Sequence, residues 1–101
     1  MEPEYRLTQP AMQDIQDISE YLAEKAGFTQ AEAFIQKLNA QFTRIARFPK
    51  LGRLRDDLQP GCRMLFVDRY KIFYLPSDRS IEILRIVSTY RDLSTVFPSD
   101  N

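Results

Sequence analysis

Apolar side chains recur every three to four positions between Pro10 and Ala26, which is the period of an amphipathic helix. Thr8 stands where a helix N-cap belongs, and Gly27 stands just past the expected end. The apolar stripe of this first helix consists of Ala11, Ile15, Ile18, Leu22 and Ala26. Its carboxylates are expected off that stripe, on a solvated face: Asp14, Asp17, Glu20 and Glu24.

A second stretch with the same period follows at once. Thr29 and Glu32 have the spacing of a capping box, and Pro49 marks the end of the predicted helix. The stripe of this helix consists of Phe34, Leu38, Phe42 and Ile45. Because the link between the two helices is so short, we expect an antiparallel helical hairpin.

The second half of the chain changes to the short, β-branched runs that are typical of strands. Lys50–Gly61 is expected to be a loop, and Asp92–Phe97 a short final helix. The expected strands are Tyr5–Thr8, Cys62–Val67, Tyr70–Leu75 and Ser80–Ser88. The last three are joined by short turns and should form an antiparallel meander.

The order β-α-α-β-β-β(-α) predicts an α+β fold over residues 1–101, a single domain with a helical hairpin packed on a small antiparallel sheet. Two helices cover one face of such a sheet, whereas both faces carry large apolar groups. We therefore expect an apolar area on the other face that docks a partner. The alternative is that the C-terminal segment with Leu93, Val96 and Phe97 folds over it.

The composition of the chain limits the kinds of site that it could form. The 101 residues include no histidine and one cysteine, Cys62, so a zinc site, a histidine base and an internal disulfide are not expected. Cys62 is interpreted as a buried structural thiol. No cofactor is expected, and no apolar run has the length of a membrane span or a signal peptide, so the expected location is the cytoplasm.

The charges are unevenly distributed although the formal net charge is zero. Residues 1–32 hold seven acidic and two basic side chains, and most arginines fall between Arg44 and Arg91. The pattern indicates either a basic patch with an anionic partner or a solvated surface with internal ion pairs. Arginine and tyrosine together could hold RNA and assist attack by a ribose hydroxyl. For Arg63 and Arg85 we favour pairing with Asp56, Asp57 or Asp92.

Several fragments, in this order, resemble the ParE branch of the ParE/RelE toxin superfamily. They are Tyr5-Arg6-Leu7-Thr8, Phe48-Pro49-Lys50-Leu51-Gly52-Arg53, Pro60-Gly61-Cys62-Arg63, Tyr70-Lys71-Ile72-Phe73-Tyr74, Ile83-Leu84-Arg85-Ile86-Val87 and Arg91-Asp92. Many ParE-like chains have His-Gly before the Arg-Asp pair, where this sequence has Ser88 and Thr89.

The resemblance implies a toxin that acts by protein binding, with DNA gyrase as the target and an antitoxin with an acidic, partly helical tail as the neutralising partner. Membrane association and sequence-specific DNA binding are not expected. The residues expected to contact antitoxin or target are Arg53, Arg55, Arg63, Met64, Phe66, Phe73, Arg85, Tyr90, Arg91 and Phe97. One alternative is a RelE-like, ribosome-dependent mRNA endoribonuclease that uses Arg53, Arg63, Arg85, Tyr90 and Arg91. Another is an inactive module that only binds the antitoxin.

Overall fold

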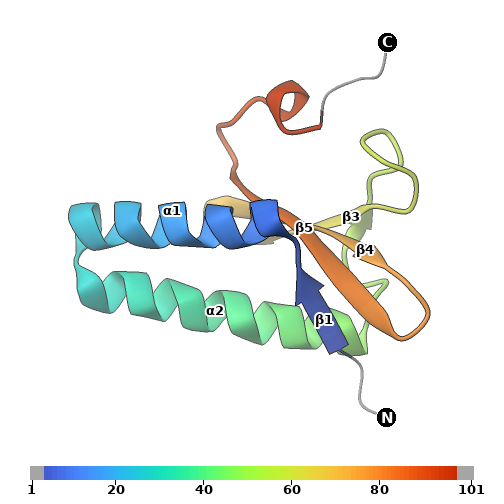
Figure 1. The fold of residues 1–101 in the computed structure, drawn as a ribbon, viewed down its shortest axis with the longest axis horizontal. Helices are drawn as coiled ribbons and strands as arrows, with labels where there is room; N and C mark the ends of the chain where they lie inside the picture. Colours follow the sequence, from blue (N-terminus) through green and yellow to red (C-terminus); the bar gives the residue numbers. More distant parts are fainter. Residues whose placement is uncertain (1–3, 98–101) are drawn as a thin grey trace.

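The computed structural model describes residues 4–97 as two helices packed on a mixed sheet (Figure 1). The sheet has five strands in the order β1-β5-β4-β3-β2. The helices are α1 (Gln9–Ala26) and α2 (Phe28–Arg47), and a 3-10 turn follows at Leu93–Thr95. The strands are β1 (Glu4–Leu7), β2 (Arg53–Leu54), β3 (Arg63–Val67), β4 (Tyr70–Pro76) and β5 (Ser80–Ser88). The predicted α+β fold class is confirmed.

The helical hairpin forms as its sequence predicts, with one correction. The Thr8 hydroxyl caps α1 by accepting a hydrogen bond from the backbone N–H of Ala11. Gly27 separates the helices with a φ of 97°, a conformation that side chains with a Cβ rarely adopt. The predicted capping box of Thr29 and Glu32 is wrong, because α2 already begins at Phe28 and no side chain caps it.

The sheet is larger and less regular than the predicted antiparallel meander. β1 joins it in parallel to β5, with Leu7 opposite Ile83. Part of the expected loop forms the edge strand β2, where Arg53 pairs with Met64. β3, β4 and β5 form the meander itself.

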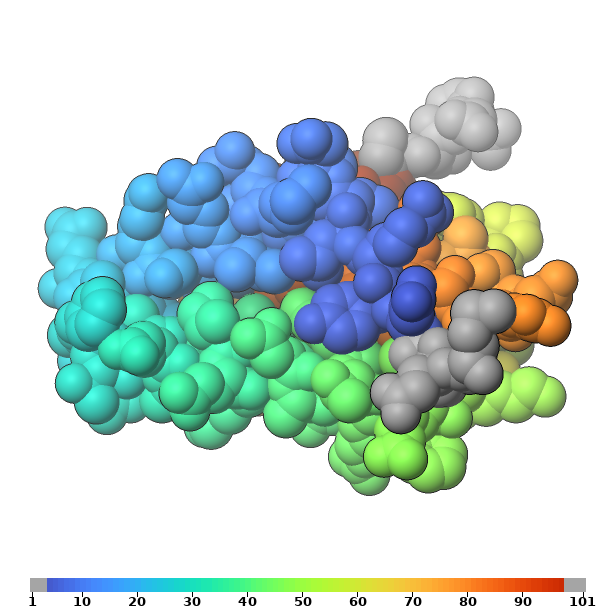
Figure 2. All heavy atoms as spheres, turned by 60° about the horizontal axis from the view of Figure 1, so that its bottom comes forward, coloured from blue at the N-terminus to red at the C-terminus, as the bar shows by residue number. Residues whose placement is uncertain are grey.

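One side of the sheet packs on the helices and holds the main core. Figure 2 shows α1 and α2 as one continuous layer, with β1 against them and the turn between β4 and β5 emerging beyond. The buried side chains of the sheet on this side are Val67, Ile72, Tyr74, Ile81, Ile83 and Ile86. They meet the helix stripes, which include Leu38, Phe42 and Ile45.

The other side of the sheet is covered by the chain itself, which corrects the prediction of an open apolar face. A second core forms there around Met64, Phe73 and Val87. Its cover consists of Leu58 from the loop before β3 and Leu93, Val96 and Phe97 from the C-terminal segment. Both covering segments lie above the sheet in Figure 1. Phe66 is the large side chain of β3 that stays 57% exposed.

Candidate functional site

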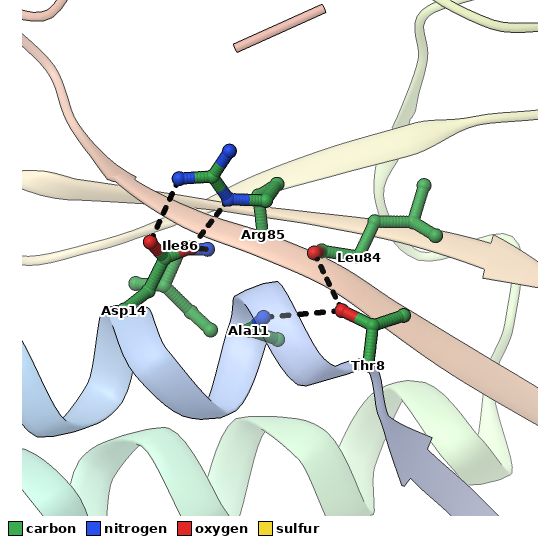
Figure 3. A network of polar contacts seen from close by, with 6 residues as sticks. All are labelled: Thr8, Ala11, Asp14, Leu84, Arg85 and Ile86. Carbon is green, nitrogen blue, oxygen red and sulfur yellow. Dashed lines mark hydrogen bonds and ion pairs between the residues drawn. The ribbon is translucent and has the colours of Figure 1, made fainter.

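The most buried ion pair within residues 4–97 joins Asp14 of α1 to Arg85 of β5 (Figure 3). The guanidinium donates from Nε and from a terminal nitrogen to the two carboxylate oxygens, at 2.7 and 2.8 Å. Asp14 is 8% exposed, so this is a nearly buried bidentate pair. The hydrogen bonds to Asp14 raise the pKa of Arg85 above its ordinary value, which keeps the guanidinium charged.

The pair lies at the point along β5 where its pairing with β1 ends and α1 becomes the neighbouring element. β1 ends opposite Ile83, and a bulge follows because Leu84 has no partner on β4. The Thr8 hydroxyl then donates to the carbonyl oxygen of Leu84 at 2.9 Å. The backbone N–H of Ile86 donates to Asp14 at 2.9 Å. Two side chains therefore satisfy the strand edge that β1 leaves open.

This geometry corrects two expectations. Asp14 is not on a solvated face, and Arg85 pairs with it rather than with Asp56, Asp57 or Asp92. The sequence does indicate that Asp14 faces the core, because Asp14 lies three residues after Ala11 and four before Ile18, and both of these are buried. A carboxylate at that spacing faces the core and requires a cation.

Arg63 is also occupied within the chain, by carbonyl oxygens and not by an acid. Its guanidinium donates to the backbone of Gly52 at 2.8 Å and of Lys50 at 3.4 Å. The hydroxyl of Tyr74, which is fully buried, accepts from the Gly52 N–H at 2.7 Å and donates to the Pro49 carbonyl at 2.8 Å. β3 and β4 thus fix the segment that follows α2.

The loop before β3 has its own internal pairs. Arg55 and Asp57 form a bidentate ion pair, which raises the pKa of Arg55 and lowers that of Asp57. Asp56 accepts from the backbone N–H of Gly61 at 2.7 Å. Cys62 is buried as predicted, and that burial raises the pKa of its thiol to about 11, so it is a poor nucleophile.

The remaining basic and aromatic candidates are exposed and far apart. Arg53 lies on the edge strand beside β3, opposite Met64. The residues that follow β5, Tyr90 and Arg91, lie at the other end of the sheet, and Tyr90 is 81% exposed. At that end the backbone N–H of Thr89 donates to the carbonyl oxygen of Arg69. β3 alone separates these ends by about 13 Å, at about 3.3 Å per residue. Within residues 4–97, none of the five nuclease candidates forms a hydrogen bond with another.

The apolar candidates divide by burial. Phe73 and Met64 are 0% and 4% exposed, because the C-terminal segment covers them, and the ring of Phe97 packs edge-on against Phe73 at 5.0 Å. Phe66 is exposed and has the ammonium group of Lys71 5.8 Å above its ring. A partner could reach Phe73 only if the C-terminal segment moved.

Two hollows on the surface offer binding space. The helix groove, of about 660 Å³, lies between the hairpin, the turn between β3 and β4, and the residues after β5. Its larger lining side chains are Ile18, Tyr21, Leu22, Phe34, Tyr70 and Tyr90. The second hollow, of about 650 Å³, follows the end of α2. Its lining includes Arg47, Phe48, Lys50, Leu51, Leu54 and Arg63, and we name these six residues the basic platform.

Within residues 4–97, no three Asp, Glu or Cys side chains are arranged to hold a metal ion. In the same range, no helix is both long and apolar enough to cross a bilayer. The polar groups described above hold the fold together or lie exposed on the surface. The two hollows present apolar side chains, and the second one also presents positive charge.

Comparisons with known proteins give a consistent result. The family described as "ParE toxin of type II toxin-antitoxin system, parDE" matches residues 5–93. Toxin ParE3 of Caulobacter vibrioides is 31% identical over 87 residues, which cover 86% of this chain and 87% of that protein. Toxin ParE1 of Mycobacterium tuberculosis is 27% identical over 94 residues, with 92% and 96% covered. The solved structure titled "Chromosomal ParDE TA system from P. aeruginosa" has a similar fold, with a TM-score of 0.72 and 22% identity over 87% of this chain and 96% of that one.

Proposed function

The chain belongs to the ParE toxin family of type II toxin–antitoxin systems, and from that premise we propose how it acts. It inhibits DNA gyrase by binding to it, and a cognate ParD-like antitoxin neutralises it. It works without catalysis of its own, in the cytoplasm. The ten contact residues expected from the sequence remain part of this proposal, with Phe73 and Met64 accessible only after the C-terminal segment moves.

The observation that supports binding over catalysis is the separation of the candidate nuclease residues. Arg85 is engaged by Asp14, and Arg63 by two carbonyl oxygens. Tyr90 lies on the helix groove, which shares no lining residue with the basic platform. RNA cleavage by general acid–base chemistry requires such groups within hydrogen-bond reach of one phosphate. The two hollows, by contrast, offer surfaces that suit protein contact.

Gyrase inhibition is tested with purified protein in a DNA supercoiling assay. We expect supercoiling to stop at micromolar protein and to recover when the protein encoded in the adjacent reading frame is added in equal amount. Tyr90→Phe is assayed in parallel, because it removes from an exposed ring only the hydroxyl that a nuclease would use. Unchanged supercoiling with the folded wild-type protein would contradict gyrase as the target.

The two alternatives give different results in the same series. Cleavage of mRNA on ribosomes, abolished by Tyr90→Phe, would establish a nuclease. Expression that leaves growth unchanged, together with tight binding to the antitoxin, would establish an inactive partner-binding module.

A further inference from the structure

The basic platform exposes three large apolar side chains close to one another. Phe48, Leu51 and Leu54 are 62%, 43% and 48% exposed, and all three line the second hollow. The end of α2 and the residues after it project at the lower edge of the molecule in Figure 2. Clustered apolar groups at a projecting edge are typical of a protein contact site.

The charges around this hollow have one sign. Arg47, Lys50 and Arg63 line it, and its lining contains no Asp or Glu. In the part of the chain that the structure describes, no carboxylate forms an ion pair with any of these three cations. The complementary surface is therefore acidic, with apolar side chains between its carboxylates.

The platform is also held in place before any partner arrives. Tyr74 and Arg63 together make four hydrogen bonds to the backbone of Pro49, Lys50 and Gly52. A Cβ on Gly52 would lie 2.6 Å from the Tyr74 hydroxyl oxygen, so the close approach requires glycine here. A rigid binding surface loses little conformational entropy on association, which favours affinity.

An extended partner suits the edge of the sheet better than a helix does. β2 is the outermost strand in the order β1-β5-β4-β3-β2, so one of its edges has no strand beside it within residues 4–97. An added segment could pair there with the backbone near Leu54 and place alternate side chains over the platform. Phe48 and Leu51 lie around the same hollow.

We propose that the basic platform binds an extended, acidic segment of the cognate antitoxin, with apolar side chains at alternate positions as anchors. This inference rests on the proposed function, because it presumes that an antitoxin binds the chain. It adds the surface and the chemistry of one contact, which is separate from the helix groove.

The test measures the affinity of the full-length cognate antitoxin by titration calorimetry. One variant, Phe48→Ala with Leu51→Ala, removes the anchors, and a second, Lys50→Glu, reverses a platform charge. The matched controls are Phe28→Ala, at a ring 72% exposed at the start of α2, and Lys25→Glu, at an exposed residue in the last turn of α1. We expect each platform variant to weaken binding about tenfold or more, by analogy with interface anchors. The controls should stay within about twofold, as contacts outside an interface do.

Salt provides a second readout. Raising NaCl from about 0.05 to about 0.5 M should weaken binding of the wild type more than binding of Lys50→Glu, because salt screens the charges at the platform rim. Circular dichroism and thermal unfolding establish that each variant is folded.

The outcomes separate the inference from the proposed function. Platform variants that are folded and bind the antitoxin as tightly as wild type overturn the inference. Platform variants that bind the antitoxin normally but no longer inhibit gyrase also overturn the inference. That outcome would assign the platform to contact with the target. Wild-type protein that does not bind the antitoxin contradicts the proposed function itself, and the inference with it.

Discussion

At the level of single residues, the fold depends on the ion pair between Asp14 and Arg85. Asp14→Ala would leave a guanidinium and the Ile86 N–H without their acceptor in a nearly buried place. We expect the free energy of unfolding to fall by about 2–4 kcal/mol, the range for losing charged hydrogen bonds and one partner of a buried pair. Urea unfolding followed by circular dichroism measures this change.

The matched control is the ion pair between Arg6 and Glu82, whose side chains are 73% and 37% exposed. Glu82→Ala should change stability by less than about 1 kcal/mol, because water screens an exposed pair. Adding Arg85→Met to Asp14→Ala should recover part of the loss, since no unpaired charge is then left. Equal effects of Asp14→Ala and Glu82→Ala would contradict the structural role of Asp14.

A second prediction at this level concerns Cys62 and alkaline pH. Burial raises the pKa of its thiol to about 11 in the folded protein, whereas the unfolded chain has the ordinary value near 9. Below about pH 9 both states hold the proton, so the contribution is fully present there. As the pH rises towards about 11, the unfolded state loses its proton first, and the free energy of unfolding falls.

The measurement is urea unfolding of wild type and Cys62→Ala at several pH values between about 7 and about 11. The variant should start about 1 kcal/mol lower, from the lost side-chain volume, and its stability should decline less steeply. Burial also raises the pKa of Tyr74 and Tyr70, so some slope remains in both proteins. Parallel curves would exclude Cys62 as a source of the pH dependence.

At the level of elements, the sequence predicts most of the fold because its periods are unambiguous. The two helices and the three strands of the meander lie within a few residues of the prediction. β2 was missed because two residues, Arg53–Leu54, are too few to show a period. The bulge at Leu84 is a local shift of register between β4 and β5 that no pattern in the sequence marks, and the capping box is not formed because α2 already begins at Phe28, after Gly27.

The candidate site was harder to predict than the fold for a related reason. The arginine content indicates that positively charged side chains contribute to the candidate site. Only the three-dimensional structure identifies the acceptor of each guanidinium. Arg63 bonds to carbonyl oxygens, which carry no signature in the sequence. The cover over the second face could not be chosen from pattern alone, since Leu93, Val96 and Phe97 fit both a covering segment and a partner site.

The C-terminal segment gives the prediction at this level. Phe97→Ala removes a half-buried ring that packs against Phe73, and should lower the free energy of unfolding by about 1–2 kcal/mol. It should also increase binding of a fluorescent apolar dye, because the second core becomes accessible. Phe28→Ala, at a ring exposed to solvent, is the control and should change neither quantity. A Phe97→Ala protein identical to wild type in both would show that the segment contributes little cover.

At the level of the whole molecule, the helical hairpin turns the uneven distribution of charges along the sequence into an uneven distribution over the surface. α1 and α2 run side by side in opposite directions in Figure 1, so the end of α2 lies beside the start of α1. The platform cations are at that end, whereas Glu20, Glu24 and Glu32 are exposed towards the closed end of the hairpin. The closed end, where Lys25 lies among these carboxylates, is therefore the more acidic end and the platform end the more basic one, although the formal net charge is zero.

Opposite ends of such molecules attract each other when little salt is present. We expect weak, reversible head-to-tail association at about 0.02 M NaCl, where the Debye length is about 20 Å, and its disappearance at about 0.3 M, where screening shortens it several-fold. Sedimentation velocity at pH about 7 over a range of protein concentrations measures the mean mass in each salt. Lys50→Glu should remove the association, since it places a negative charge on the basic end. A mass that does not respond to salt, or a Lys50→Glu protein that associates like wild type, would mean that the two ends do not act as complementary surfaces.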